Sequence, residues 1–299
     1  MKSNLKRIYM NKGNFDILNN RRYLIYSNPF YLVNRFIVRI DDRLNNNYLF
    51  NLKDLGIIDN DDNRYTSNYD YLYNVVSSSN SKSDVFALLH VASNKKGNNY
   101  TGIITKDGIG YGLNNGVTDY YTNLINGKRN SYPIEAIVAK VFDKILHKTL
   151  ATCYFENNSF YFCNSLCLSE SFIIDFMKKI DIYHDNYIEL IHCYREKFEK
   201  ERYYNNEIYG KNLKEKNIQL QRLYNKIHFL EKENYSIVYD IYYSLVDFIE
   251  NSEIIYNEKI KLIEYINNEF NKLFCKEEFN YLSNLNNVFE NVNVRKLVK

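Results

Sequence analysis

The chain of 299 residues contains no tryptophan, two prolines and ten glycines, whereas tyrosine occurs thirty times. Asparagine, lysine and isoleucine are also frequent, a bias typical of coding sequence that has drifted toward A and T. Such drift weakens any argument from a single tyrosine or asparagine. The hydrophobic fraction of 45% excludes a disordered chain and is sufficient for a large core.

Cysteine is also scarce, and its five copies show no paired spacing. This pattern argues against a disulfide scaffold and favours a reducing compartment. No apolar run follows the first basic residues as it does in a signal peptide, and no segment approaches the roughly 20 apolar residues of a membrane span. We therefore expect an intracellular protein, cytoplasmic or nuclear, without a membrane partner.

Positive charge is concentrated at the N-terminus although the formal net charge is only +3. The first forty residues carry eight Lys or Arg against one Asp, a net charge of +7, which leaves −4 for the remainder. Apolar runs at 23–26 and 30–40 around Pro29 predict two strands. Interleaved arginines and tyrosines there are typical of surfaces that bind single-stranded nucleic acid, although ordinary exposed strands also carry them. The candidate nucleic-acid-binding residues are Lys6, Arg7, Arg21, Arg22, Arg35 and Arg39.

Seven of the ten glycines lie between Gly97 and Gly127. The pair Asp107-Gly108 lies between two apolar segments, which predicts a β-hairpin over 101–113. Gly108, Gly110 and Gly112 would leave one strand face bare, so they define a possible ligand pocket. The spacing matches no nucleotide-binding fingerprint, and a closely packed, bulged hairpin is the other interpretation.

Other segments predict ordinary elements. We expect helices over 85–92 and 133–147, a second hairpin over 149–168 around Asn157-Asn158, and a flexible connection at 77–83.

The acidic segment 59–70 has part of the spacing of a calcium loop, but Arg64 replaces the required glycine. His147, Cys153, Cys163 and Cys167 lack the close pairs of a zinc site, and no Cys and His pair is arranged as a catalytic dyad. The sequence thus predicts no metal, no cofactor and no catalytic residue.

From Ser169 onward the pattern is helical, with a turn expected between Tyr203 and Gly210 and a short last helix over 282–292. The second long helix continues with or without a break around Asn251-Ser252. Apolar residues repeat with period 3.5 over 213–241, which is typical of a coiled coil. The same seam also suits a bundle within one chain, and both interpretations stay open. The candidate oligomerisation residues are Leu213, Leu220, Leu223, Ile227, Leu230, Asn234, Ile237 and Ile241.

The predicted fold is therefore α+β: a mixed head with β-hairpins and short helices over 1–168, with a possible internal boundary at 77–83, followed by a helical region over 169–299. We expect a non-enzymatic protein that associates with itself and contacts DNA or RNA through its basic N-terminus. The alternatives are an interaction factor that binds another protein through its C-terminal helices, such as an inhibitor, immunity factor or scaffold, and an enzyme with a pocket at the glycines. The layout and composition resemble those of proteins from insect poxviruses, other large DNA viruses and linear plasmids.

Overall fold

The computed structural model describes residues 6–9, 29–52, 55–59, 68–78, 84–95, 100–127, 131–206 and 213–274. Its elements, in chain order, are β1 (Lys6–Tyr9), α3 (Pro29–Ile40), the 3-10 helix η1 (Asp42–Leu44), α4 (Asn45–Leu52), β2 (Gly56–Asp59), β3 (Asn68–Asp70), β4 (Val75–Ser78), α5 (Asp84–Ala92), α6 (Tyr111–Asn126), α7 (Pro133–Leu146), α8 (Lys148–Phe155), α9 (Ser159–Asn164), α10 (Glu170–Asn206), α11 (Leu213–Asn251) and α12 (Tyr256–Phe274).

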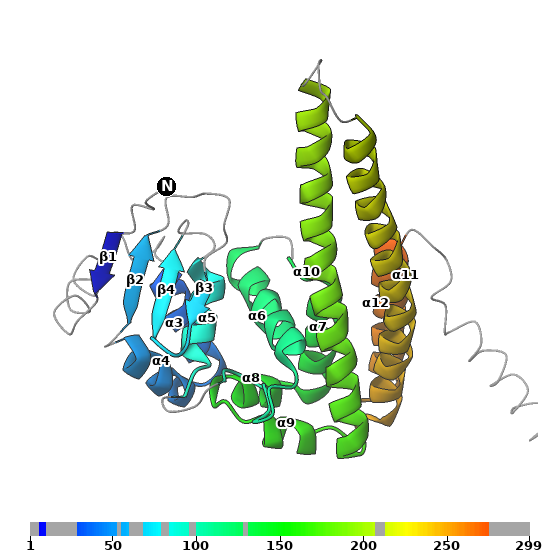
Figure 1. Ribbon diagram of the computed structural model, residues 1–299. Helices are drawn as coiled ribbons and strands as arrows, with labels where there is room; N and C mark the ends of the chain where they lie inside the picture. Colours follow the sequence, from blue (N-terminus) through cyan, green and yellow to red (C-terminus); the bar gives the residue numbers. More distant parts are fainter. Residues whose placement is uncertain are drawn as a thin grey trace, which may run out of the picture.

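The elements form three adjoining groups (Figure 1). The strands and the helices α3 to α5 lie at one end, α6 to α9 occupy the middle, and the long helices α10 to α12 form the other end. One hydrophobic core runs through all three groups, from Val33 on α3 to Phe270 on α12. The same core includes Val76 and Val85, on either side of the expected connection at 77–83, and continues from Leu166 to Ile173 across the expected boundary at 168.

The four short strands form one sheet in the order β1-β2-β4-β3. β2 pairs with β4 in parallel, and the two outer pairs are antiparallel. β3 and β4 are joined by a turn that ends at Asn74, whose φ of 50° lies in the left-handed region that asparagine tolerates. This small sheet is the only one in the described ranges.

The predicted α+β fold class is wrong, because the described chain is predominantly helical. The segment 30–40, predicted as a strand, belongs to the helix α3. Val33 and Ile37 are buried at a spacing of four residues. Arg35 between them and Val38 after them are exposed, which is helical and not strand periodicity. Pro29 begins the helix, where a missing N–H has no consequence. The other predicted strand, at 23–26, lies outside the described residues.

The glycine segment is not a hairpin. Residues 101–110 form compact turns with a single isolated bridge, between Asn94 and Thr101. Gly110, at a φ of 96°, precedes α6, and Asn115-Gly116, a residue pair typical of turns, lies inside this helix. Hydrogen bonds of the helix and burial of its face against α7 and α10 outweigh the local turn preference of these residues.

The second predicted hairpin, over 149–168, is likewise two short helices, α8 and α9. The turn at Asn157-Asn158 was located correctly, since Asn157 has a φ of 54° and the Asn158 side chain accepts a hydrogen bond from the Tyr161 N–H to cap α9. Buried residues at Leu150, Cys153 and Tyr154 follow helical spacing. The turn therefore connects helices instead of strands.

Two helices in this part of the chain confirm their predictions. The helix predicted over 85–92 is α5, and the one predicted over 133–147 is α7, with Pro133 in its first turn. Ile134, Ile137, Val138 and Val141 all face the core, as their spacing requires.

The C-terminal helices also follow the predicted pattern. α10 ends at Asn206 within the expected turn, and α11 ends at Asn251, so the break that the sequence left open is present. Most of the proposed calcium segment, residues 79–83 of the expected connection and the predicted last helix over 282–292 lie outside the described residues.

Candidate protein-binding surface

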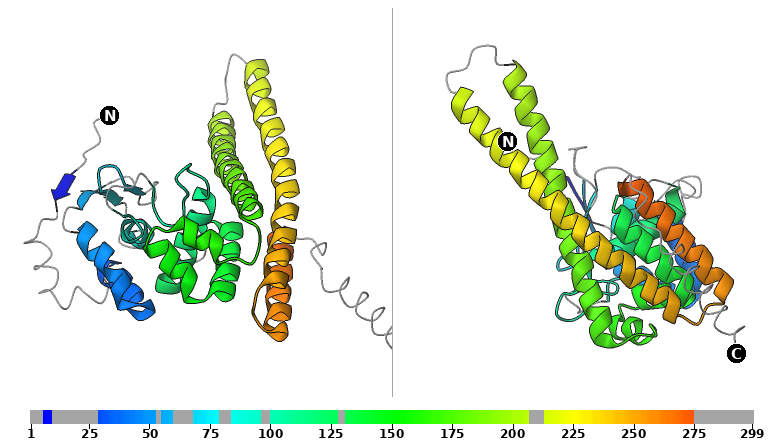
Figure 2. Two further views of the ribbon diagram at one scale, coloured as in Figure 1. Left: turned by 90° about the horizontal axis from the view of Figure 1, so that it is seen from below. Right: turned by 90° about the vertical axis from the view of Figure 1, so that its right-hand side faces the viewer.

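The distal parts of α10 and α11 form an antiparallel hairpin that projects beyond the rest of the molecule (Figures 1 and 2). We call residues 188–206 and 213–232 the arm. Its apolar contacts form a small core of its own, separate from the main core, in which Leu190 packs against Cys193, Leu223, Ile227 and Leu230. The arm is therefore a folded extension and not a helix held only at its base.

Polar contacts between the two helices add to this core. Lys226 forms an ion pair with Glu189, and the Tyr194 hydroxyl donates a hydrogen bond to the Glu231 carboxylate. That hydrogen bond raises the pKa of Tyr194 to about 12, so its hydroxyl stays a neutral donor. Exposed ion pairs contribute little free energy, so the apolar contacts are the main stabilising term in the arm.

The residues of the predicted heptad seam pack within the chain. Leu223, Ile227, Leu230, Asn234 and Ile241 are buried, and Leu220 and Ile237 are partly buried. Leu213 begins α11, and its side chain is not among those described. The seam therefore serves the α10–α11 hairpin, which is the second of the two interpretations that the sequence left open, and a second copy would have to open the hairpin to reach it.

A different row of apolar side chains on the arm remains accessible. Ile191, Tyr194 and Phe198 follow one another on α10 with Arg195 and Glu199 between them, and they line a shallow depression of about 340 Å³. We call these five residues the outer face. Phe198 is 65% exposed and Tyr194 is 43% exposed. A spacing of three and four residues places them on one side of the helix, so they present a continuous surface.

The sequence reasoning missed the outer face. It treated the helix after Ser169 only as a helical pattern and did not consider Phe198. The available signal was the second row, in which Ile191 and Phe198 are seven residues apart and alternate with charged residues. An apolar row in such a strongly charged helix is a candidate interface even when another row explains the core.

The candidate nucleic-acid residues are only partly visible in the structure. Arg35 and Arg39 are exposed and lie four residues apart on α3, on one side of this helix. Lys6 and Arg7 belong to β1, where only the backbone is described, and Arg21 and Arg22 lie outside the described residues. The arginines at 35 and 39 thus share a helical face instead of the strand surface that was expected.

The glycines of the predicted pocket permit close contact between α6 and α10. A Cβ atom at Gly110 would lie 2.1 Å from the Met177 Cε, and one at Gly112 would lie 2.9 Å from the carbonyl oxygen of Ile180. Only Gly108 faces open space. The positions beside Gly110 and Gly112 are therefore filled by α10, which agrees with the closely packed interpretation and not with a ligand pocket at the glycines.

Asp181 makes this close packing specific. Its carboxylate accepts hydrogen bonds from the Gly110 N–H at 2.7 Å and the Gly112 N–H at 2.8 Å, and so caps the N-terminus of α6 from another helix. Burial raises the pKa of Asp181 to about 6, partly offset by the two N–H donors. The sequence could not reveal this pair, because the partners are about seventy residues apart.

A buried polar pair lies next to this cap. The His184 Nδ1 is 2.8 Å from Glu135 Oε1, and both side chains are almost fully buried. The Asn115 amide nitrogen lies 3.0 Å from His184 Nε2, an arrangement that suits an imidazole with its proton on Nδ1. Among the described residues, Glu135 Oε2 has no hydrogen-bond partner. The pair joins α6, α7 and α10.

The cysteines considered as zinc ligands or nucleophiles lie on or near the short helices α8 and α9. Cys153 and Cys163 are buried on α8 and α9, and Cys167 is exposed after α9. Burial raises the pKa of Cys153 to about 12 and that of Cys163 to about 11, so both thiols are protonated at neutral pH. No group of three or more potential metal ligands is found within the described ranges.

Comparisons with protein-family models, with curated proteins and with solved structures find no match for this chain. None of the helices in the described part of the chain has both the length and the apolar character needed to cross a membrane.

Proposed function

We propose that this chain is a non-enzymatic interaction protein that associates with itself through the outer faces of two arms. The observation that carries the proposal is the accessible row of Ile191, Tyr194 and Phe198 on a projecting helix. Contiguous apolar residues at the surface of a projecting element are typical of protein interfaces. Aromatic side chains and arginine are also the residue types enriched at interface centres.

A second copy suits the outer face because the face is close to self-complementary. In a two-fold symmetric antiparallel pair, each residue of one helix meets a residue of the other copy from the opposite direction. Phe198 of one copy then lies near Tyr194 of the other, and Arg195 near Glu199. Two such arms would form a four-helix bundle, in which each arm keeps its own small core.

This proposal keeps the predicted self-association but assigns it to new residues. The seam of Leu223, Ile227 and Leu230 holds each arm together, and the outer face joins two arms. We place the protein in the cytoplasm or nucleus. This part of the proposal is supported by the described cysteines, Cys153, Cys163, Cys167 and Cys193, all of which are free thiols.

The test is the mass in solution, measured by light scattering, of the wild-type chain and of Phe198→Glu. We expect the wild type to be a dimer and the variant to be a folded monomer with unchanged circular dichroism. Phe160→Glu is the matched control, because Phe160 is 71% exposed on α9 but lies outside the arm. It should remain a dimer.

Charge reversal tests the antiparallel geometry itself. Arg195→Glu and Glu199→Arg should each weaken the dimer through like charges across the interface, and the double variant should restore it. A wild-type monomer, or a dimer that Phe198→Glu leaves intact, would overturn the proposal. In the first case, another protein becomes the partner to test on the same face, which is the interaction-factor alternative.

A second proposal keeps nucleic-acid contact at the opposite end of the molecule. It is supported by Arg35 and Arg39, which are exposed on one side of α3, and by the excess of positive charge in the first forty residues. Arginines four residues apart on a helix can contact neighbouring phosphates. The contacts would be electrostatic, so they should weaken steeply with salt.

A further inference from the structure

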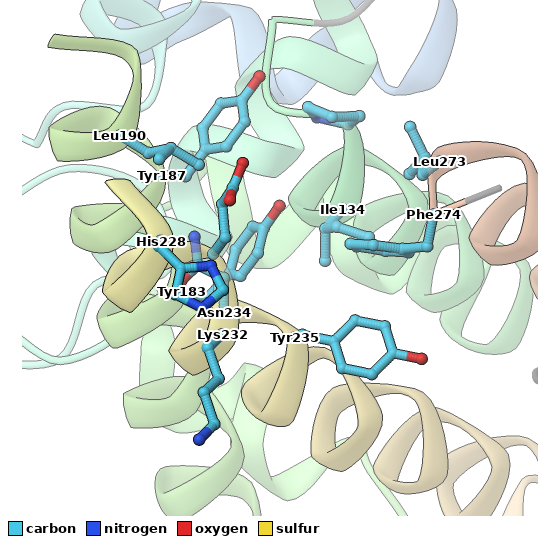
Figure 3. A pocket seen from close by; sticks show the side chains of 12 residues that line it. Ile134, Tyr183, Tyr187, Leu190, His228, Lys232, Asn234, Tyr235, Leu273 and Phe274 are labelled. Carbon is cyan, nitrogen blue, oxygen red and sulfur yellow. The ribbon is translucent and has the colours of Figure 1, made fainter. Parts of the chain in front are cut away.

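A cavity of about 740 Å³ lies at the base of the arm, where α10, α11, the start of α7 and the end of α12 meet (Figure 3). Its volume is within the range of pockets that hold small molecules. Aromatic rings dominate its walls: Tyr183 and Tyr187 come from α10, Tyr235 from α11 and Phe274 from α12. Figure 3 shows Tyr187 and Ile134 on opposite sides of the cavity.

The polar groups of the cavity come mainly from α11. Asn234 is only 6% exposed, it lines the cavity, and its Oδ1 has no hydrogen-bond partner among the described residues. A buried amide oxygen without a partner is costly, so it is a position where a ligand gains free energy by donating a hydrogen bond. Glu231 lies three residues earlier and also lines the cavity.

The charge of the cavity favours a cationic ligand. Glu231 supplies a carboxylate, Asn234 supplies an acceptor oxygen, and the aromatic rings attract a cation through their electron-rich faces. The basic groups of the lining are Lys232 and His228, and both residues are exposed. Lys232 points away from Tyr187 and Ile134 in Figure 3. A ligand that satisfies the acceptor oxygens of the cavity is therefore one that carries a positive charge and N–H donors.

We propose that this cavity binds an organic amine, with its ammonium group donating to Asn234 Oδ1 near Glu231 and its carbon skeleton between the aromatic walls. This site adjoins the outer face through Glu231, which also accepts a hydrogen bond from the Tyr194 hydroxyl, but it lies within one copy and does not require self-association. The shared chemistry is a protonated amine on an apolar skeleton. Three kinds of ligand carry such an amine: an aryl amine, an aliphatic polyamine, and the lysine side chain of a peptide.

The chain contains no tryptophan, so an indole probe reports binding without background. We would titrate tryptamine with the full-length protein and follow the fluorescence anisotropy of its indole ring. Tryptophol carries the same ring with a hydroxyl in place of the ammonium and is the matched ligand control. We expect tryptamine to bind roughly tenfold or more tightly than tryptophol, the difference made by a charged hydrogen bond.

Two substitutions at one position test the assigned contact. Asn234→Leu removes the acceptor and should weaken tryptamine binding roughly tenfold or more, with little effect on tryptophol. Asn234→Asp places a carboxylate at the same point and should tighten tryptamine binding. Phe160→Glu, far from the cavity, should leave both affinities unchanged. The melting temperature of each variant shows whether lost binding reflects lost folding.

Competition identifies the source of the amine. Displacement of tryptamine by spermidine assigns the site to polyamines, displacement by the amide of N-acetyl-lysine assigns it to a lysine side chain, and failure of both assigns it to aryl amines. Equal binding of tryptamine and tryptophol, tryptamine binding that Asn234→Leu does not change, or no anisotropy change with the wild-type protein would each overturn the proposal. These outcomes are independent of the oligomeric state.

Discussion

The carboxylate of Asp181 on α10 accepts hydrogen bonds from the backbone of Gly110 and caps α6 from across the core. A second hydrogen bond, from the Gly112 N–H, completes the cap, and Gly112 itself has no room for a side chain against α10. The glycines and the aspartate thus work together. The absence of side chains at these two glycines lets the helices approach, and the carboxylate satisfies the N–H groups that begin α6.

Asp181→Ala should therefore lower the free energy of unfolding by about 1–3 kcal/mol, because it leaves two buried N–H groups without partners. Denaturant unfolding followed by circular dichroism measures this loss. Asp185→Ala is the control, since Asp185 is exposed and, within the described part of the chain, its carboxylate accepts a hydrogen bond from the Tyr111 hydroxyl alone. A loss of similar size in both variants would contradict the assigned cap.

Two buried asparagines should respond in opposite directions to the same substitution. Asn234 Oδ1 has no partner among the described residues, so Asn234→Leu should raise the free energy of unfolding by about 1 kcal/mol or more. Asn267 Oδ1 accepts a hydrogen bond from the Tyr242 hydroxyl, so Asn267→Leu removes this bond and should lower the free energy of unfolding by about 1 kcal/mol. Equal destabilisation in the two variants would show that Asn234 has a structural partner.

The stability should also depend on the ionisation of Asp119. Its carboxylate accepts a hydrogen bond from the Tyr132 N–H, and burial raises its pKa from 3.8 to about 6. The folded state then binds the proton more tightly than the unfolded state, so the contribution of Asp119 is greatest below pH 4 and is lost as the pH rises to about 6.

Asp119→Asn removes this dependence. The unfolding free energy of the variant minus that of the wild type should rise between pH 4 and pH 6, with a slope of up to about 1.4 kcal/mol per pH unit. Denaturant unfolding at intervals across this range measures the difference. Two parallel curves would show that Asp119 has the same pKa in the folded and the unfolded chain.

The second proposal predicts a salt-dependent loss of nucleic-acid binding. Arg35→Glu with Arg39→Glu should weaken binding of a single-stranded oligonucleotide, and should reduce the slope of log affinity against log salt by up to about 2. Lys261→Glu with Lys272→Glu makes the same change in charge on α12 and should have less effect. A wild-type affinity that is constant between low and moderate salt would contradict nucleic-acid binding.

Sequence reasoning located turns better than it identified the elements between them. The turn at Asn157-Asn158 is present, and α10 ends at Asn206, within the segment 203–210 where a turn was predicted. The flanking strands were wrong because this composition is rich in isoleucine, tyrosine and other residues that favour strands, while burial follows helical spacing at Val33 and Ile37. Strand propensity is weak compared with packing, so these segments adopt the helical conformation that buries their apolar residues in the core.

The candidate sites were less predictable than the fold. The outer face was visible in the sequence only as a second apolar row next to the expected one. The cavity at the base of the arm was not visible at all, because its walls come from α7, α10, α11 and α12. Asn234 was recognised as an interruption of the heptad seam, but its unpartnered oxygen follows from the surroundings of its side chain.

The sequence by itself determined the long C-terminal helices, the helices α5 and α7 and the period of the seam, because these depend on spacing within one segment. Only the tertiary structure decided that the seam packs within the chain, that Asp181 caps α6 and that the outer face stays accessible. Each of these three features depends on which surfaces are in contact. Those contacts are stabilised by burial of apolar surface between segments that are distant in sequence.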